Sequence, residues 1–241
     1  MLSHKPDVVL STGGQQTVRA VKAATSIVPV VFITGDASQE GIVSNYARPE
    51  GNLTGICALA SSTDAQRVQL LRDLLPKAKT VAVLWNPEAP GVRSAHDETQ
   101  DAAARLGFRL DWIAARNDAE IERALAAIPL QGTDALLVLA DPVLGFRRRR
   151  IVEFANANRM PGMYFWREFV QDGGLISYGT HLTALYRRAA AFVDKILKGA
   201  KPFQLVVEQP TTFGLVLNLR TAAALNIDVP KSVMLRADLV P

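Results

Sequence analysis

Short apolar runs alternate along most of the chain with segments in which apolar residues recur every three or four positions. The runs are typical of buried strands, and the spaced apolar residues are typical of helices with one buried face. The expected strands are 7–11, 28–34, 53–59, 80–85, 109–113, 135–140, 162–165, 175–178 and 213–219. The expected helices are 15–25, 38–47, 65–75, 92–106, 118–128, 144–158, 185–197 and 222–225, and 204–209 is expected to be extended.

Regular alternation of strand and helix predicts an α/β fold with parallel sheets flanked by helices on both faces. Polar residues near Ser61 to Asp64 and Gly179 to Thr183 mark the expected breaks between two lobes. We therefore expect a partial N-terminal lobe over 1–61 and a C-terminal lobe over 62–179 that is complete by itself. Residues 180–241 are expected to return to the first lobe and the hinge, because two or three strands alone make a poor open sheet.

The stretch 135–150, ALLVLADPVLGFRRRR, contains the clearest change from apolar to polar residues. The strand stops at Asp141-Pro142, because proline cannot continue it, and a helix follows. Asp141 thus lies at the carboxyl end of a buried strand, where open α/β sheets bind ligands. It either caps the helix or contacts a ligand. Arg147–Arg150 are expected to form a solvated helix face close to carboxylates.

Small or polar residues follow other strands at the same relative position. The candidates are Thr12, Gly13, Gly14, Gly35, Asp36, Asn86, Asp141, Trp166 and Glu168. Glycines at a strand-to-helix turn let a ligand approach backbone N–H groups, although a tight turn without a ligand is the alternative. Asn86 precedes a proline and is equally well explained as a turn residue, and Trp166 as a cover of the core.

Composition adds few constraints on function. The chain has 241 residues, 49% of them hydrophobic, and a net charge of +4 that is too small and too scattered to indicate nucleic-acid binding. The three histidines stand in unrelated contexts, without a metal-binding or catalytic motif, so we expect no enzyme activity, metal or cofactor. The single cysteine, Cys57, is expected to be buried. The first residues lack the apolar core of a signal peptide, and no run reaches the length of a membrane span.

Several long segments resemble the ABC-transporter substrate-binding protein family of the tryptophan/tyrosine type. They are KPDVVLSTGG, ITGDASQEGIVSNYARPEGNLTG, QRVQLLRDLLPKAKTVAVLWNP, the run from Tyr164 to Leu225 and the tail VPKSVMLRAD. The resemblance implies a type I periplasmic-binding-protein fold, in which two α/β lobes close on a small solute. Family members carry an export signal and further strand–helix units ahead of KPDVV, so we expect the first lobe here to be incomplete.

The resemblance also implies the function and the partners. We expect a periplasmic or extracytoplasmic solute-binding component of an ABC importer, with a small solute, such as an aromatic amino acid, and a permease as partners. Thr12 and the Gly13 and Gly14 amides would hold the solute's carboxylate, Asp36 or Asp141 its ammonium group, and Trp166 its side chain. Arg147–Arg150 are an alternative contact for phosphate or the permease. The other functional hypothesis is an intracellular ligand-sensing regulatory domain of the same fold.

Overall fold

The computed structural model describes residues 4–58, 63–89 and 92–241, so the expected break at Ser61 lies outside the described residues. The chain forms two compact units, one of residues 1–60 with 180–212 and one of residues 61–179 with 213–241. Residues 213–241 were expected to join the first lobe, but they do not. They belong to unit 2, because strand β9, Gly214–Asn218, pairs antiparallel with β8, Ile176–Gly179.

Unit 1 contains a parallel sheet of three strands in the order β1, β2, β3. These are β1, Val9–Ser11, β2, Val30–Thr34, and β3, Leu53–Cys57. All five residues of β2 are buried, as expected for a strand that is covered on both faces. The register places Ser11 beside Phe32 and Thr34 beside Cys57, so the carboxyl ends of neighbouring strands lie along one edge.

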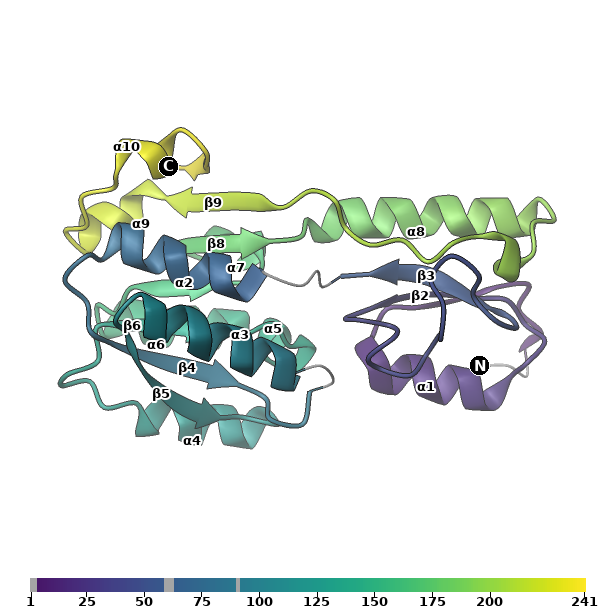
Figure 1. Ribbon diagram of the computed structural model, residues 1–241, viewed down its shortest axis with the longest axis horizontal. Coiled ribbons are helices and arrows are strands. Elements are labelled where there is room, and N and C mark those ends of the chain that lie inside the picture. The colour runs from purple at the N-terminus through teal and green to yellow at the C-terminus, as the bar shows by residue number, and fades with distance from the viewer. Residues whose placement is uncertain (1–3, 59–62, 90–91) are drawn as a thin grey trace. The chain divides into compact units, whose positions relative to one another are not determined.

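Helices cover both faces of this sheet. Val18 and Val21 of α1, Gly14–Ala24, share a core with Phe32, while α8, Leu182–Leu197, packs with Phe192 against Val31 on the other face. Figure 1 shows α8, in green, running along this sheet although it is distant in sequence. The two cores follow from the alternation of side chains along β2.

Unit 2 contains a seven-stranded sheet in the order β10-β9-β8-β7-β6-β4-β5. Besides β8 and β9, its strands are β4, Thr80–Trp85; β5, Arg109–Ala114; β6, Ala135–Val138; β7, Gly162–Tyr164; and β10, Asp238–Val240. All its pairs are parallel except β8 with β9. The sheets and their covering helices confirm the expected α/β class.

Both faces of this sheet are also covered. Residues of α2, Thr63–Leu74, and α3, Val92–Arg105, pack against one face together with Val81 and Val83 of β4. Residues of α4, Asp118–Ala127, α5, Pro142–Phe146, α6, Arg148–Ala157, and α7, Arg167–Gln171, pack against the other face. The chain closes with α9, Leu219–Ala224, and α10, Lys231–Met234, beside the first of these cores. None of the described helices is both long and apolar enough to cross a membrane.

Three expected elements differ in the structure. Residues 38–47 form turns instead of a helix, because Gly41 has a φ of +66° and ends the first turn. The expected helix 144–158 is divided into α5 and α6 at Arg147, which lies outside helical geometry at φ −97° and ψ 13°. In place of a fully extended 204–209, a 3₁₀ turn over Pro202–Gln204 precedes a parallel bridge between Glu208 and Ile56.

Candidate ligand-binding site

The expected site residues of unit 2 follow three strands that are neighbours in the sheet. Asn86 comes directly after β4, Asp141 after β6, and Trp166 and Glu168 after β7. Because β4, β6 and β7 are adjacent and parallel, their carboxyl ends meet at one edge. Sequence order alone does not show that these strands are adjacent.

Asp141 is the centre of a small polar network at this edge. Its Oδ1 accepts hydrogen bonds from the backbone N–H groups of Val143, at 2.8 Å, and Leu144, at 3.1 Å. Its Oδ2 accepts from Nδ2 of Asn86 at 3.1 Å. The side chain therefore caps α5, with Pro142 in the first turn, and the capping role expected as one alternative is confirmed.

Burial decides the electrostatics of Asp141. The residue is only 5% exposed, and desolvation raises the pKa of its carboxyl group, against the hydrogen bonds that lower it. Both of its oxygens already accept hydrogen bonds within the protein. Asp141 is thus less suited to bind a ligand's ammonium group than the sequence indicates.

Trp166 lies at the start of α7 and packs against two residues. An ideal Cβ built on Gly145 of α5 would lie 2.2 Å from Cζ3 of the indole, so the ring rests directly on the glycine backbone. The Phe165 ring lies on another side, with centroids 4.7 Å apart and planes at 56°. The indole remains partly exposed, and its support by Gly145 was not expected from the sequence.

Glu168, in the first turn of α7, has the least satisfied carboxylate of the site. Its Oε2 is buried and has no hydrogen-bond partner among the described residues. An unpaired buried carboxylate oxygen is costly unless a cationic or donor group reaches it. This distinguishes Glu168 from Asp141 as a binding group.

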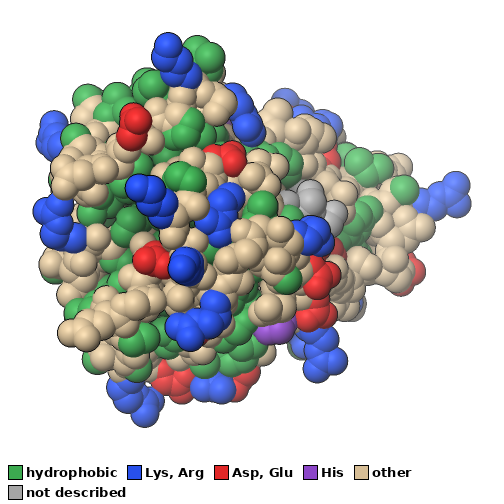
Figure 2. All heavy atoms as spheres, turned by 60° about the vertical axis from the view of Figure 1, so that its left-hand side comes forward, with side chains coloured by type: hydrophobic (Ala, Val, Ile, Leu, Met, Phe, Trp, Pro, Cys, Tyr) green, Lys and Arg blue, Asp and Glu red, His purple; other side chains and the backbone are tan. Residues whose placement is uncertain are grey.

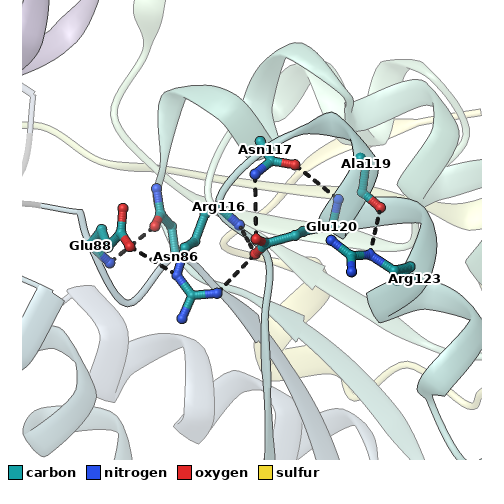
Figure 3. Close-up of polar contacts among 7 residues, drawn as sticks. All are labelled: Asn86, Glu88, Arg116, Asn117, Ala119, Glu120 and Arg123. Carbon is teal, nitrogen blue, oxygen red and sulfur yellow. Dashed lines mark hydrogen bonds and ion pairs between the residues drawn. The ribbon is translucent and has the colours of Figure 1, made fainter.

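A second polar chain, drawn in Figure 3, continues along the edge to the end of β5. Oδ1 of Asn86 accepts from the Glu88 N–H at 3.0 Å, and the Glu88 carboxylate pairs with Arg116 Nε at 3.0 Å. Arg116 also pairs with Glu120 at 3.0 Å, while Asn117 caps α4 by accepting from the Glu120 N–H. Arg116 was not expected at the site from the sequence, although the spacing of Asn117 and Glu120 is typical of a helix start.

In unit 1, Thr12, Gly13 and Gly14 follow β1, and Gly35 and Asp36 follow β2. The parallel pairing of these strands brings the two groups to one edge of the three-stranded sheet. Gly13 is the N-cap of α1, and Gly14 has a φ of +77°, which favours glycine. The local backbone is therefore the expected strand-to-helix turn.

Asp36 holds a turn, much as Asp141 does. Its Oδ1 accepts from the N–H groups of Ser38 and Gln39, each at 3.0 Å, and from the Tyr46 hydroxyl at 2.5 Å. Beside it lies a buried carboxylate that was not expected from the sequence, Glu40. It accepts from the Thr34 hydroxyl and, at 3.3 Å, from the Asp36 N–H. Burial raises the pKa of Glu40.

The charged and thiol groups expected outside the site lie as the sequence predicts. Arg147, Arg148 and Arg150 pair with Asp118, Asp172 and Glu122, respectively. On the face shown in Figure 2, basic side chains are spread singly among acidic and apolar ones, so the described side chains visible there form no continuous basic surface. Cys57 is buried, and burial raises the pKa of its thiol.

Two α/β units with polar groups at the carboxyl ends of parallel strands define a class of ligand-binding protein, and solved structures place the fold among type I periplasmic binding proteins. The chain belongs to the family described as ABC transporter substrate binding protein, which matches residues 1–240. This confirms the resemblance seen in the sequence and the expectation of a binding protein instead of an enzyme.

Individual relatives show the same similarity. A tyrosine-binding protein of Clostridioides difficile is 21% identical over 94% of this chain, which spans 65% of that relative's length. The structure of a conserved domain protein of Vibrio cholerae is 27% identical with a TM-score of 0.89, and the match covers 100% of this chain and 80% of that chain. The structure of an ABC domain from Streptococcus pneumonia in complex with L-Trp is 24% identical with a TM-score of 0.86, and the match covers 98% of this chain and 81% of that chain.

Proposed function

We propose that the chain is the solute-binding component of an ABC importer, that it acts outside the cytoplasm with a permease as its partner, and that its solute is an amino acid with an aromatic side chain. Family membership supports the binding role. The tyrosine-binding and L-Trp-bound relatives support the class of solute.

One observation carries the proposal. A partly exposed indole, fixed by Gly145 and Phe165, lies two residues from a carboxylate whose Oε2 has no hydrogen-bond partner among the described residues. An aromatic side chain gains energy by packing against an indole, and an ammonium group satisfies a buried carboxylate. We therefore assign the solute's side chain to Trp166 and its ammonium group to Glu168.

The remaining site residues have supporting roles in this proposal. Within unit 1, Thr12 and the amides of Gly13 and Gly14 at the start of α1 offer donors suited to a carboxylate. Gly35 lets a solute approach the adjoining strand end. Asp36, Asn86 and Asp141 hold the loops in place, since the carboxylates of both aspartates accept hydrogen bonds inside their own units.

A thermal-shift experiment with single amino acids tests the proposal. L-tryptophan or L-tyrosine should raise the melting temperature, because a solute at 100 times its Kd adds about 2.7 kcal/mol to the free energy of unfolding. Glu168→Gln should abolish most of the shift, while the control Glu153→Gln, on the exposed side of α6, should retain it. A chain whose melting temperature responds to no amino acid would contradict the proposal.

A further inference from the structure

Among the glycines whose surroundings the structure describes, only Gly145 lies so close to the Trp166 indole that a side chain there would meet the ring. A Cβ there would lie 2.2 Å from Cζ3 and 2.9 Å from both Cε3 and Cη2 of the indole. Three atoms of the six-membered ring thus rest against the backbone of α5. Any side chain at position 145 would have to displace the ring.

The position of Gly145 is itself fixed by the polar network of the site. Its N–H donates to the Asp141 carbonyl at 2.9 Å, and the Asp141 side chain caps the same helix while it accepts from Asn86. A continuous series of contacts therefore leads from the end of β4 through α5 to the indole at the start of α7. A ring held by backbone and by a neighbouring aromatic side chain loses little further freedom when a ligand binds.

We propose that Gly145 is the positioning residue that sets the location of the Trp166 indole and thereby makes the site select an aromatic ligand side chain. The selection of an aromatic ligand rests on the proposed function. The positioning of the Trp166 ring rests on the geometry of α5 and α7 alone. Gly145 acts through Trp166 and is not itself a contact of the ligand.

The structural part is tested by fluorine NMR on protein labelled with 5-fluorotryptophan. The chain has three tryptophans, and the signal missing from Trp166→Phe identifies Trp166. Gly145→Ala should shift this signal and leave the other two unmoved, because Trp85 and Trp112 pack on each other with centroids 5.1 Å apart. An unmoved Trp166 signal would overturn the inference.

A double-mutant cycle separates this contact from a general loss of folding. Alanine is the better helix former, so Gly145→Ala should be neutral or stabilising in the Trp166→Phe background, where the smaller ring leaves room for the methyl group. In the unmodified chain it should lower the melting temperature. Equal effects in both backgrounds would show that the methyl group does not meet the ring.

The ligand part is tested by calorimetric titration with L-tryptophan and L-alanine. Gly145→Ala should weaken L-tryptophan binding about tenfold or more and change L-alanine binding less than about threefold, so the ratio of the two affinities falls. Equal losses for both ligands, or an unchanged ratio with a displaced ring, would overturn the selectivity role. If the unmodified chain binds neither ligand, the proposed function and the selectivity role fall together, while the NMR result still decides the positioning role.

Discussion

The acidic residues of this chain differ mainly in what surrounds each carboxylate. Asp36 and Asp141 look like ligand groups in the sequence, yet each accepts backbone hydrogen bonds that hold a turn or cap a helix. Glu168 has a buried oxygen without a partner among the described residues. Glu40 is the most buried of the four, since the residue is only 3% exposed. A carboxylate that is already satisfied stabilises the fold, whereas an unsatisfied one has capacity for a ligand.

Removal of the Asp141 side chain separates capping from binding. Asp141→Ala should reduce the free energy of unfolding by about 1–2 kcal/mol, because α5 loses its cap. Asp141→Asn should keep the cap, because the amide oxygen can still accept the two backbone hydrogen bonds, but its amide nitrogen would face Nδ2 of Asn86, so only the bond to Asn86 is lost. Chemical denaturation measures both values. Calorimetry on the same variants measures solute affinity, and a large stability loss with unchanged affinity would leave Asp141 with capping alone.

Glu40 should make stability depend on pH. Burial raises the pKa of Glu40 above the ordinary value of 4.5. Between pH 4.5 and this raised pKa, the folded chain keeps a proton on Glu40 that the unfolded chain has lost. The contribution is fully present below the unfolded pKa and is lost as the pH rises through the folded pKa.

Glu40→Gln mimics the protonated carboxyl group, since the amide can donate to Thr34 and accept from the Asp36 N–H. The stability of the unmodified chain relative to this variant should therefore increase as the pH is lowered from neutral towards 4.5. Urea denaturation at several pH values measures this difference, with Glu50→Gln, an exposed change in the same unit, as the control. A difference that does not vary with pH would contradict the role of Glu40.

Two arginines on different helices show how burial within an element sets the contribution of an ion pair to the free energy of unfolding. Arg67 of α2 is 2% exposed, pairs with Asp64 and donates from Nε to the Tyr178 carbonyl at 2.8 Å, so it ties the start of α2 to the end of β8. Arg150 of α6 pairs with Glu122 at 2.9 Å but is 43% exposed. Solvent screens the second pair and not the first.

Arg67→Ala should cost about 3–5 kcal/mol of the free energy of unfolding, because it leaves the largely buried Asp64 carboxylate, 13% exposed, and the Tyr178 carbonyl without their buried partner. Arg150→Ala, the matched control, should cost less than about 1 kcal/mol, and added salt should reduce that cost. Denaturation curves at low and high salt measure both. Similar costs for the two variants would contradict the argument from burial.

At the scale of the whole molecule, each unit needs chain segments that are distant in sequence. The core of unit 1 includes α8, and the sheet of unit 2 is extended by β9 and β10 after the chain has passed through unit 1. Leu215 and Leu217 of β9 are buried in the larger core of unit 2. The expectation that 62–179 forms a complete domain by itself therefore overlooks a strand that covers the edge of β8.

A chain that ends at Thr212 tests this dependence. It should melt at a lower temperature and aggregate, because the loss of β9 exposes the edge of β8 and removes buried apolar surface. The control, a chain that ends at Ala237, loses only β10 and the exposed C-terminal residues and should behave nearly like the whole chain. Circular dichroism and light scattering measure both effects, and equal melting temperatures for the two shortened chains would show that β9 contributes little.

The sequence by itself determined the class of fold, the positions of most strands and helices, and the edge of each sheet where polar residues gather. Local rules suffice for these features, because apolar spacing, glycine turns and the Asp141-Pro142 pair act within a few residues. Only the tertiary structure decided that β9 joins unit 2, that Asp141 bonds to Asn86, and that the Trp166 ring rests on Gly145. It also decided that Glu168 keeps an oxygen without a partner in the part of the chain that the structure describes. These features depend on which distant segments become neighbours, and a pattern of single residues carries no information about the partner that each buried group finds.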